Sequence, residues 1–146
     1  NITVDKPDLI RGNRVLVIED GPTLTHGEMG YGSGTIAAQK HGAAEIVDPR
    51  PGARGSMADT FKRFPWVGKA LPAMGYSPIQ LEDLAATINA TLCDSIVVAT
   101  PVDLARLIPF AKPYCRVRYD LEEISRPDLA DCIATFVQAQ AHRLPR

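Results

Sequence analysis

The sequence predicts a three-layer α/β domain built around a mainly parallel sheet of about four strands. Short, continuous apolar runs at residues 15–18 and 96–99 are typical of strands that are buried on both faces, as in parallel sheets. Segments with helical spacing lie between the strands, and this alternation favours a parallel sheet covered by helices. We therefore expect both apolar runs at the centre of the sheet, in a Rossmann-like arrangement.

The other elements follow from local signals. Helix starts are marked by a capping residue with an acid or amide three positions later, as at Ser56 and Asp59 or Ser125 and Asp128. In order, the expected elements are a strand at 15–18, a helix at 33–41, a strand at 45–47, a helix at 56–64, a helix from Ser77, a strand at 95–99, a helical turn or two within 102–108, a strand at 114–119 and a helix from Ser125. Residues 1–12 have no such pattern and are expected to be a linker, which leaves 13–146 as a single domain.

Two further patterns predict which side chains lie on the same face of a strand or helix. Cys115, Val117 and Tyr119 alternate with arginines, which predicts a strand with one polar side near a sheet edge. In the last helix, four apolar residues share one face and predict a buried stripe: Leu129, Ile133, Phe136 and Val137.

Composition restricts the class of protein. The 146 residues carry a net charge of −1, with 45% hydrophobic and 23% charged residues, so neither nucleic acid nor a membrane is an expected partner. The chain has no signal-peptide pattern, and its three cysteines are far apart without a CxxC pair. These features predict a cytoplasmic protein with reduced thiols. The chain lacks an initial Met, which suggests a fragment.

The densest functional signal is the glycine-rich stretch 19–34, which leaves the first strand and leads into a helix. Glycines allow close approach of a ligand, and a helix N-terminus offers free N–H groups, so the stretch is a candidate phosphate cradle. It matches neither GxGxxG nor the Walker A motif, and a tight loop without a ligand is the alternative. The candidate phosphate-binding residues are Gly21, Thr23, Thr25, Gly27, Gly30, Gly32 and Gly34.

Titratable groups at the strand ends add possible chemistry. Glu19 and Asp20 are candidate Mg²⁺ ligands, and Asp20 and His26 are candidate catalytic groups, with solvated surface side chains as the alternative. Asp48 and Arg50 follow the second strand. They either bind a phosphate or pair with each other. Parallel strands place their carboxyl ends along one edge, so we expect all these residues to form one site.

Asp103 follows the strand at 95–99 and is expected either to cap a helix or to contact a ligand in the same site. The apolar segment 71–76 is read as a loop that forms a lid, a subunit contact or part of the core.

Five segments together resemble the C-terminal third of the cyclic 2,3-diphosphoglycerate synthetase family, many of whose members are called predicted GTPases. The resemblance covers essentially the whole chain, and its most specific part is the string Glu-Asp-Gly-Pro-Thr-Leu-Thr-His-Gly at 19–27. The other segments are 2–5, 45–51, 71–76 and 116–119. Glu28 stands where a small residue is expected.

The resemblance implies a longer, nucleotide-dependent enzyme with an upstream P-loop region, which uses ATP or GTP and Mg²⁺ on a small phosphorylated substrate. This chain contains no GxxxxGK[ST] and no Asn-Lys-x-Asp motif. We therefore expect it to contribute a phosphate- or substrate-binding loop to a synthetase or GTPase whose P-loop lies elsewhere, within a homo-oligomer. The alternative is a non-catalytic structural or dimerisation domain.

Overall fold

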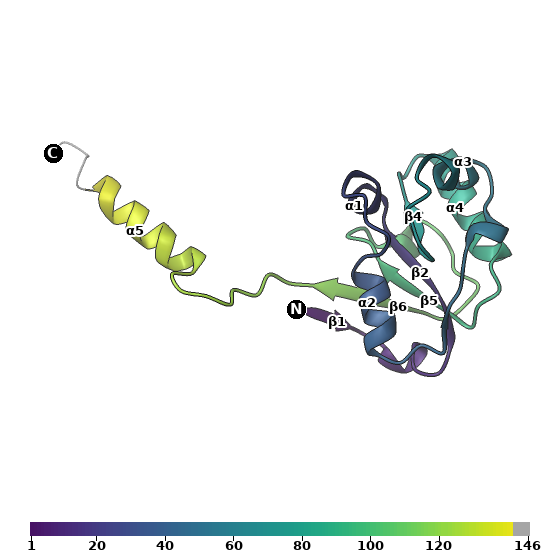
Figure 1. Cartoon of the computed structure of the whole chain (residues 1–146), viewed down its shortest axis with the longest axis horizontal. Helices are drawn as coiled ribbons and strands as arrows, with labels where there is room; N and C mark the ends of the chain where they lie inside the picture. The colour runs from purple at the N-terminus through teal and green to yellow at the C-terminus, as the bar shows by residue number, and fades with distance from the viewer. Residues whose placement is uncertain (142–146) are drawn as a thin grey trace.

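A six-stranded, mostly parallel sheet forms the centre of the domain (Figure 1). The structure is a computed structural model that describes residues 1–141. The strand order is β1-β6-β5-β2-β3, with β4 also paired to β2, and only the β1–β6 pair is antiparallel. The strands are β1 (Ile2–Val4), β2 (Arg14–Asp20), β3 (Glu45–Ile46), β4 (Leu71–Ala73), β5 (Ser95–Ala99) and β6 (Tyr114–Tyr119).

Helices cover both faces of this sheet, which confirms the predicted three-layer α/β architecture. The described α-helices are α1 (Gly21–His26), α2 (Ser33–Lys40), α3 (Ser56–Arg63), α4 (Pro78–Ala90) and α5 (Leu129–Ala141). Short 3-10 helices occur at η1 (Pro7–Leu9), η2 (Arg50–Gly52) and η3 (Leu104–Arg106). None of the described helices combines the length and the apolar character needed to cross a membrane.

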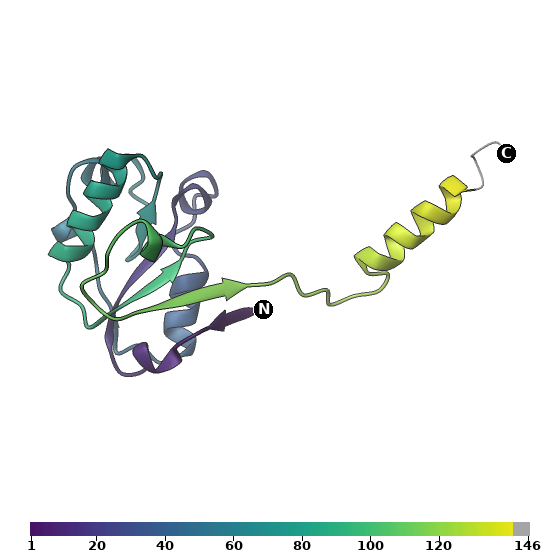
Figure 2. The same ribbon diagram turned by 180° about the vertical axis from the view of Figure 1, so that it is seen from behind.

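Two apolar clusters join the layers. Alternate residues of β2 point to opposite faces, so Leu16 and Ile18 pack with α3 and α4, whereas Val15 and Val17 pack with α2. Helix α2 lies on one side of the sheet and α3 and α4 lie on the other, as the two opposite views show (Figure 2). As predicted, β2 and β5 are central, and the β5 residues are all buried.

The first twelve residues are not a simple linker. Residues Ile2–Val4 form β1, which pairs antiparallel with β6, and Ile10 is completely buried in the α2-side cluster. A three-residue strand is too short to show a periodic pattern in the sequence. Its conformation depends on pairing with β6, which lies more than a hundred residues further along the chain. The same shortness hid β4, expected as a loop, so the sheet has six strands and not about four.

The last helix forms as predicted, but its apolar stripe is not buried. The side chains of Leu129, Ile133, Phe136 and Val137 are 54–64% exposed, and α5 projects from the body on an extended segment (Figures 1 and 2). The N-terminus of α5 is also not closed by Ser125. Instead, Asp128 accepts a hydrogen bond from the Asp131 N–H, and the Asp131 side chain accepts one from the Asp128 N–H.

The expected capping box at Ser56 is absent as well. The N-cap of α3 is Gly55, and the Ser56 N–H donates instead to Asp83 on α4, at 2.8 Å. A side chain distant in sequence replaces the local cap. The predicted capping box of α4, between Ser77 and Gln80, is present.

Candidate functional site

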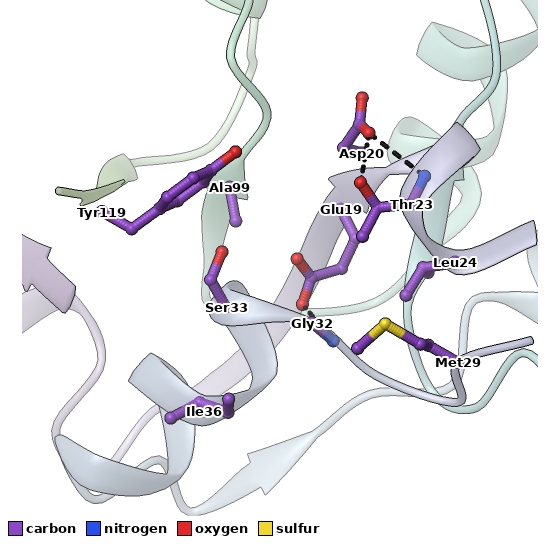
Figure 3. Close-up of a pocket in the computed structure, with 10 residues that line it drawn as sticks. All are labelled: Glu19, Asp20, Thr23, Leu24, Met29, Gly32, Ser33, Ile36, Ala99 and Tyr119. Carbon is purple, nitrogen blue, oxygen red and sulfur yellow. Dashed lines mark hydrogen bonds between the residues drawn. The ribbon is translucent and has the colours of Figure 1, made fainter. Parts of the chain in front are cut away.

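A pocket of about 260 Å³ opens at the carboxyl ends of β2 and β5 (Figure 3). Such strand ends are where parallel α/β sheets bind ligands. We call it the strand-end pocket. Its lining residues come from β2, α1, the following loop, α2, β5 and β6: Glu19, Asp20, Thr23, Leu24, Met29, Gly32, Ser33, Ile36, Ala99 and Tyr119.

The buried carboxylate of Glu19 occupies the expected phosphate cradle. It is 2% exposed and accepts hydrogen bonds from the N–H groups of Gly32, Gly34 and Thr35, at 2.8–3.2 Å, and from the Thr35 hydroxyl. Burial raises the pKa of Glu19, and these donors offset part of that effect. A Cβ atom at Gly32 would lie 2.6 Å from a Glu19 carboxylate oxygen, so the glycine is needed for this close approach.

This arrangement favours the alternative of a loop without a phosphate. The donors at the start of α2 point at the protein's own carboxylate, which has the charge and hydrogen-bonding capacity of an anionic ligand. A phosphate at these N–H groups would have to displace a carboxylate that is buried and held by four donors.

Asp20 lies at the end of β2 and caps α1. Its Oδ2 accepts hydrogen bonds from the N–H (3.2 Å) and the hydroxyl (2.6 Å) of Thr23, whereas no described residue donates to Oδ1. Burial raises the pKa of the Tyr76 hydroxyl, and the negative charge of Asp20 adds to this shift, so the two groups lie near each other. Asp20 therefore has one carboxylate oxygen free to meet a ligand.

Glu19 and Asp20 do not form a larger cluster of metal ligands. Within residues 1–141, no group of three or more His, Cys, Asp or Glu side chains is placed to hold a metal ion. The carboxylates of the two residues also have different partners, as Figure 3 shows: Glu19 faces Gly32, and Asp20 faces Thr23.

His26 lies outside the strand-end pocket. It lines a second hollow of about 390 Å³ on the side of α1 that faces α3. The other lining residues are Ser56, Asp59, Thr60, Arg63, Phe64, Met74 and Gln80. His26 and Asp20 therefore belong to different depressions, although only five residues lie between them in the sequence.

Asp48 and Arg50 pair with each other, with 2.9 Å between Arg50 Nε and Asp48 Oδ1. This pairing was the alternative prediction. Asp48 lines a hollow with Arg14, at the start of β2, and Thr91, at the end of α4. The reason is that β3 pairs with β2 only at Arg14 and Val15. The chain leaves the sheet there, far short of Asp20, and the expected single site does not include this pair.

The Asp103 side chain neither accepts a capping hydrogen bond at the start of η3 nor lines the strand-end pocket. It forms ion pairs with Arg116, at 3.4 Å, and Arg106, at 3.7 Å. Of the expected site residues, the strand-end pocket contains Glu19, Asp20, Thr23 and Gly32.

The other candidate residues of the stretch have structural contacts. Thr25 is buried, and its hydroxyl donates to the Gly21 carbonyl, at 3.0 Å. A Cβ at Gly21 would lie 2.6 Å from the Ala73 carbonyl, and one at Gly34 would lie 2.8 Å from side chains of β2 and β5. Gly27 is the C-cap of α1, and Gly30 accepts a hydrogen bond from the Gly68 N–H.

The expected site did not include the apolar wall or the aromatic residue of this pocket. Leu24, Met29 and Ile36 supply the apolar surface, and Tyr119 contributes its ring from the end of β6. The alternation of residues 114–119 contained the signal for Tyr119, because it placed this side chain on the same face as Cys115 and Val117, which pack on the α2 side of the sheet.

One similar protein relates the chain to a longer enzyme. The arginine synthetase ArcE of Thermococcus kodakarensis is 54% identical over 137 residues. The match covers 94% of this chain, including the whole strand-end pocket, but only 31% of that protein. No protein-family model matches the chain, and no solved structure matches it. The chain is therefore similar to a segment that makes up about a third of a longer synthetase.

Proposed function

We propose that this chain is one domain of a longer, nucleotide-dependent synthetase that forms arginine. The observation that carries the proposal is its 54% identity, over 137 residues, to a segment of an arginine synthetase. The matched segment includes the strand-end pocket, which lies where ligands of parallel α/β sheets bind. The similarity therefore supports a related reaction as well as a related fold.

The nucleotide would bind to another part of the longer protein. The chain contains no Walker A sequence. In addition, the N–H groups at the start of α2, the best candidates for a phosphate cradle, are taken by Glu19. The described residues thus do not fit a triphosphate with Mg²⁺, and the contribution of this domain is a substrate pocket.

The charge of the pocket distinguishes between possible substrates. Among the residues that the structure describes, its lining includes the carboxylates of Glu19 and Asp20 but no Lys, Arg or His. Like charges repel strongly in a partly buried site, so a polyanion such as 2,3-diphosphoglycerate is disfavoured there. This observation favours arginine formation over the cyclisation of a diphosphate.

The test uses the longer protein that contains this chain. It is incubated with ATP or GTP, Mg²⁺, ammonia and a ureido amino acid, which differs from arginine by an oxygen in place of a nitrogen. We expect arginine, detected by mass spectrometry, to appear together with the nucleotide product of ATP or GTP cleavage, and the ureido oxygen to leave in the released phosphate or pyrophosphate. Parallel incubations contain 2,3-diphosphoglycerate. Formation of the cyclic diphosphate without any arginine would refute the proposal.

A further inference from the structure

We infer that the strand-end pocket binds the side-chain end of arginine, with Asp20 as the charged partner and Tyr119 as a stacking surface. The inference rests on the proposed function. It places the amino-acid side chain that takes part in the reaction in this pocket. Three properties of the pocket support it: its charge, its apolar wall and its aromatic ring.

The charge of the pocket favours a cation. Glu19 is fully engaged by the start of α2, but Asp20 uses only Oδ2 for Thr23. Within residues 1–141, no basic side chain lines the pocket to neutralise the free Oδ1 of Asp20. A guanidinium group can donate to this oxygen in a charge-assisted hydrogen bond.

The wall of the pocket suits an aliphatic chain. Met29 and Ile36 are each 40% exposed, so apolar surface is available inside the opening. The methylene groups of an arginine side chain would cover this surface while its charged head meets Asp20. A small inorganic cation would leave the same surface in water.

The aromatic ring favours a guanidinium over an ammonium group. Tyr119 is 58% exposed, and Figure 3 shows its ring on the opposite side of Glu19 from Leu24 and Met29. A planar guanidinium stacks on an aromatic face and is weakly hydrated, whereas an ammonium group is a compact, strongly hydrated charge. The pocket should therefore distinguish arginine from lysine.

The first experiment measures binding to the 146-residue chain by calorimetry, with L-arginine, L-lysine and inorganic phosphate as probes. We expect arginine to bind at least about ten-fold more tightly than lysine, and phosphate not to compete with it. The substitution Asp20→Asn keeps an oxygen that can accept from Thr23, so the cap of α1 is retained. It should weaken arginine binding about 10- to 100-fold, the equivalent of a lost charge-assisted contact.

Matched variants separate the two contacts. Tyr119→Phe keeps the ring and should retain the preference for arginine over lysine. Tyr119→Leu removes the ring and should reduce this preference to a few-fold difference in affinity. Asp8→Asn removes an equal charge at Asp8, which pairs with Arg11 outside the pocket, and should leave binding unchanged. The thermal unfolding midpoint of each variant confirms that it is folded.

The second experiment separates this inference from the proposed function. In the longer protein, Asp20→Asn should weaken competitive inhibition by added arginine at least about ten-fold, because arginine, unlike the ureido substrate, carries the charge that pairs with Asp20. If arginine is formed and its inhibition constant is unchanged, the inference is wrong and the proposed function stands. If the longer protein forms no arginine but the chain binds arginine through Asp20, the proposed function is wrong and the pocket assignment stands.

Discussion

Glu19 acts as an internal ligand of the glycine-rich stretch. Residues of this stretch must approach its carboxylate closely, and Gly32 and Gly34 permit this because they have no Cβ. The first turn of α2 then receives its hydrogen-bond acceptor from β2 and not from its own N-cap, Gly32. Two of the glycines that suggested a phosphate site, Gly32 and Gly34, therefore serve an internal carboxylate.

This role predicts a stability cost for Glu19→Gln. An amide has one acceptor oxygen, and its NH₂ group would face the N–H donors of Gly32, Gly34 or Thr35. We expect the free energy of unfolding to fall by about 1–3 kcal/mol. Urea denaturation measures the change, and the exposed Glu82 on α4 provides the control Glu82→Gln. Equal stability of the two variants would contradict the internal-ligand role.

Glu28 offers a second residue-scale prediction. Its φ of 49° lies in the left-handed region, which costs energy for residues with a Cβ, and it is the one non-glycine residue in this region among those described. Glu28→Gly should raise the free energy of unfolding by about 0.5–1 kcal/mol. Glu28→Ala retains the strained conformation and should give no gain. If both variants are equally stabilised, the effect belongs to the charge and not to the backbone.

At the scale of elements, α5 is not part of the core that stabilises the domain. Its four stripe residues are more than half exposed, whereas Ile88 of α4 is 2% exposed. Removal of residues 129–146 should therefore change the free energy of unfolding by no more than about 0.5 kcal/mol, while Ile88→Ala should cost about 2–5 kcal/mol. A loss of 2 kcal/mol or more on truncation would show that α5 packs against the body in solution.

Elements with strong local signals were predictable. Continuous apolar runs identified β2 and β5, and the combination of Ser77, Pro78 and Gln80 identified the start of α4. The missed elements are short or contain misleading residues. The segment 71–76 was expected to be a loop, yet Leu71–Ala73 is fully buried beside β2. The stretch after β2 was read as a glycine-rich loop, although Asp20 as N-cap with Pro22 in the first turn is also a helix start.

Burial in α5 was wrongly predicted for a different reason. Helical spacing shows that apolar residues share a face, but it does not show which surface meets that face. The same spacing in α4 is matched by contacts of Leu84 and Ile88 with the sheet. The sequence alone does not distinguish the two helices.

At the scale of the whole molecule, the site was only partly predictable. The rule that ligands bind at strand carboxyl ends located Glu19, Asp20 and Gly32 correctly in one pocket. It failed for Asp48 and Arg50 because β4 takes the place beside Ile18–Asp20 and leaves β3 paired only with Arg14 and Val15. The extent of strand pairing depends on neighbouring strands, which local sequence patterns do not reveal.

The distribution of functional groups over the whole molecule leads to a last prediction, that the 146-residue chain alone does not hydrolyse ATP or GTP. Phosphoryl transfer requires groups that neutralise the phosphates, such as a P-loop lysine and a held Mg²⁺. In the described part of the chain, the strand-end pocket is lined by two carboxylates and no basic residue, and the helix N-terminus beside it is occupied by Glu19. Phosphate release from either nucleotide should therefore stay at the level of a protein-free control, with the longer protein as the positive control. Mg²⁺-dependent release that rises in proportion to the concentration of the purified chain would place a nucleotide site within it.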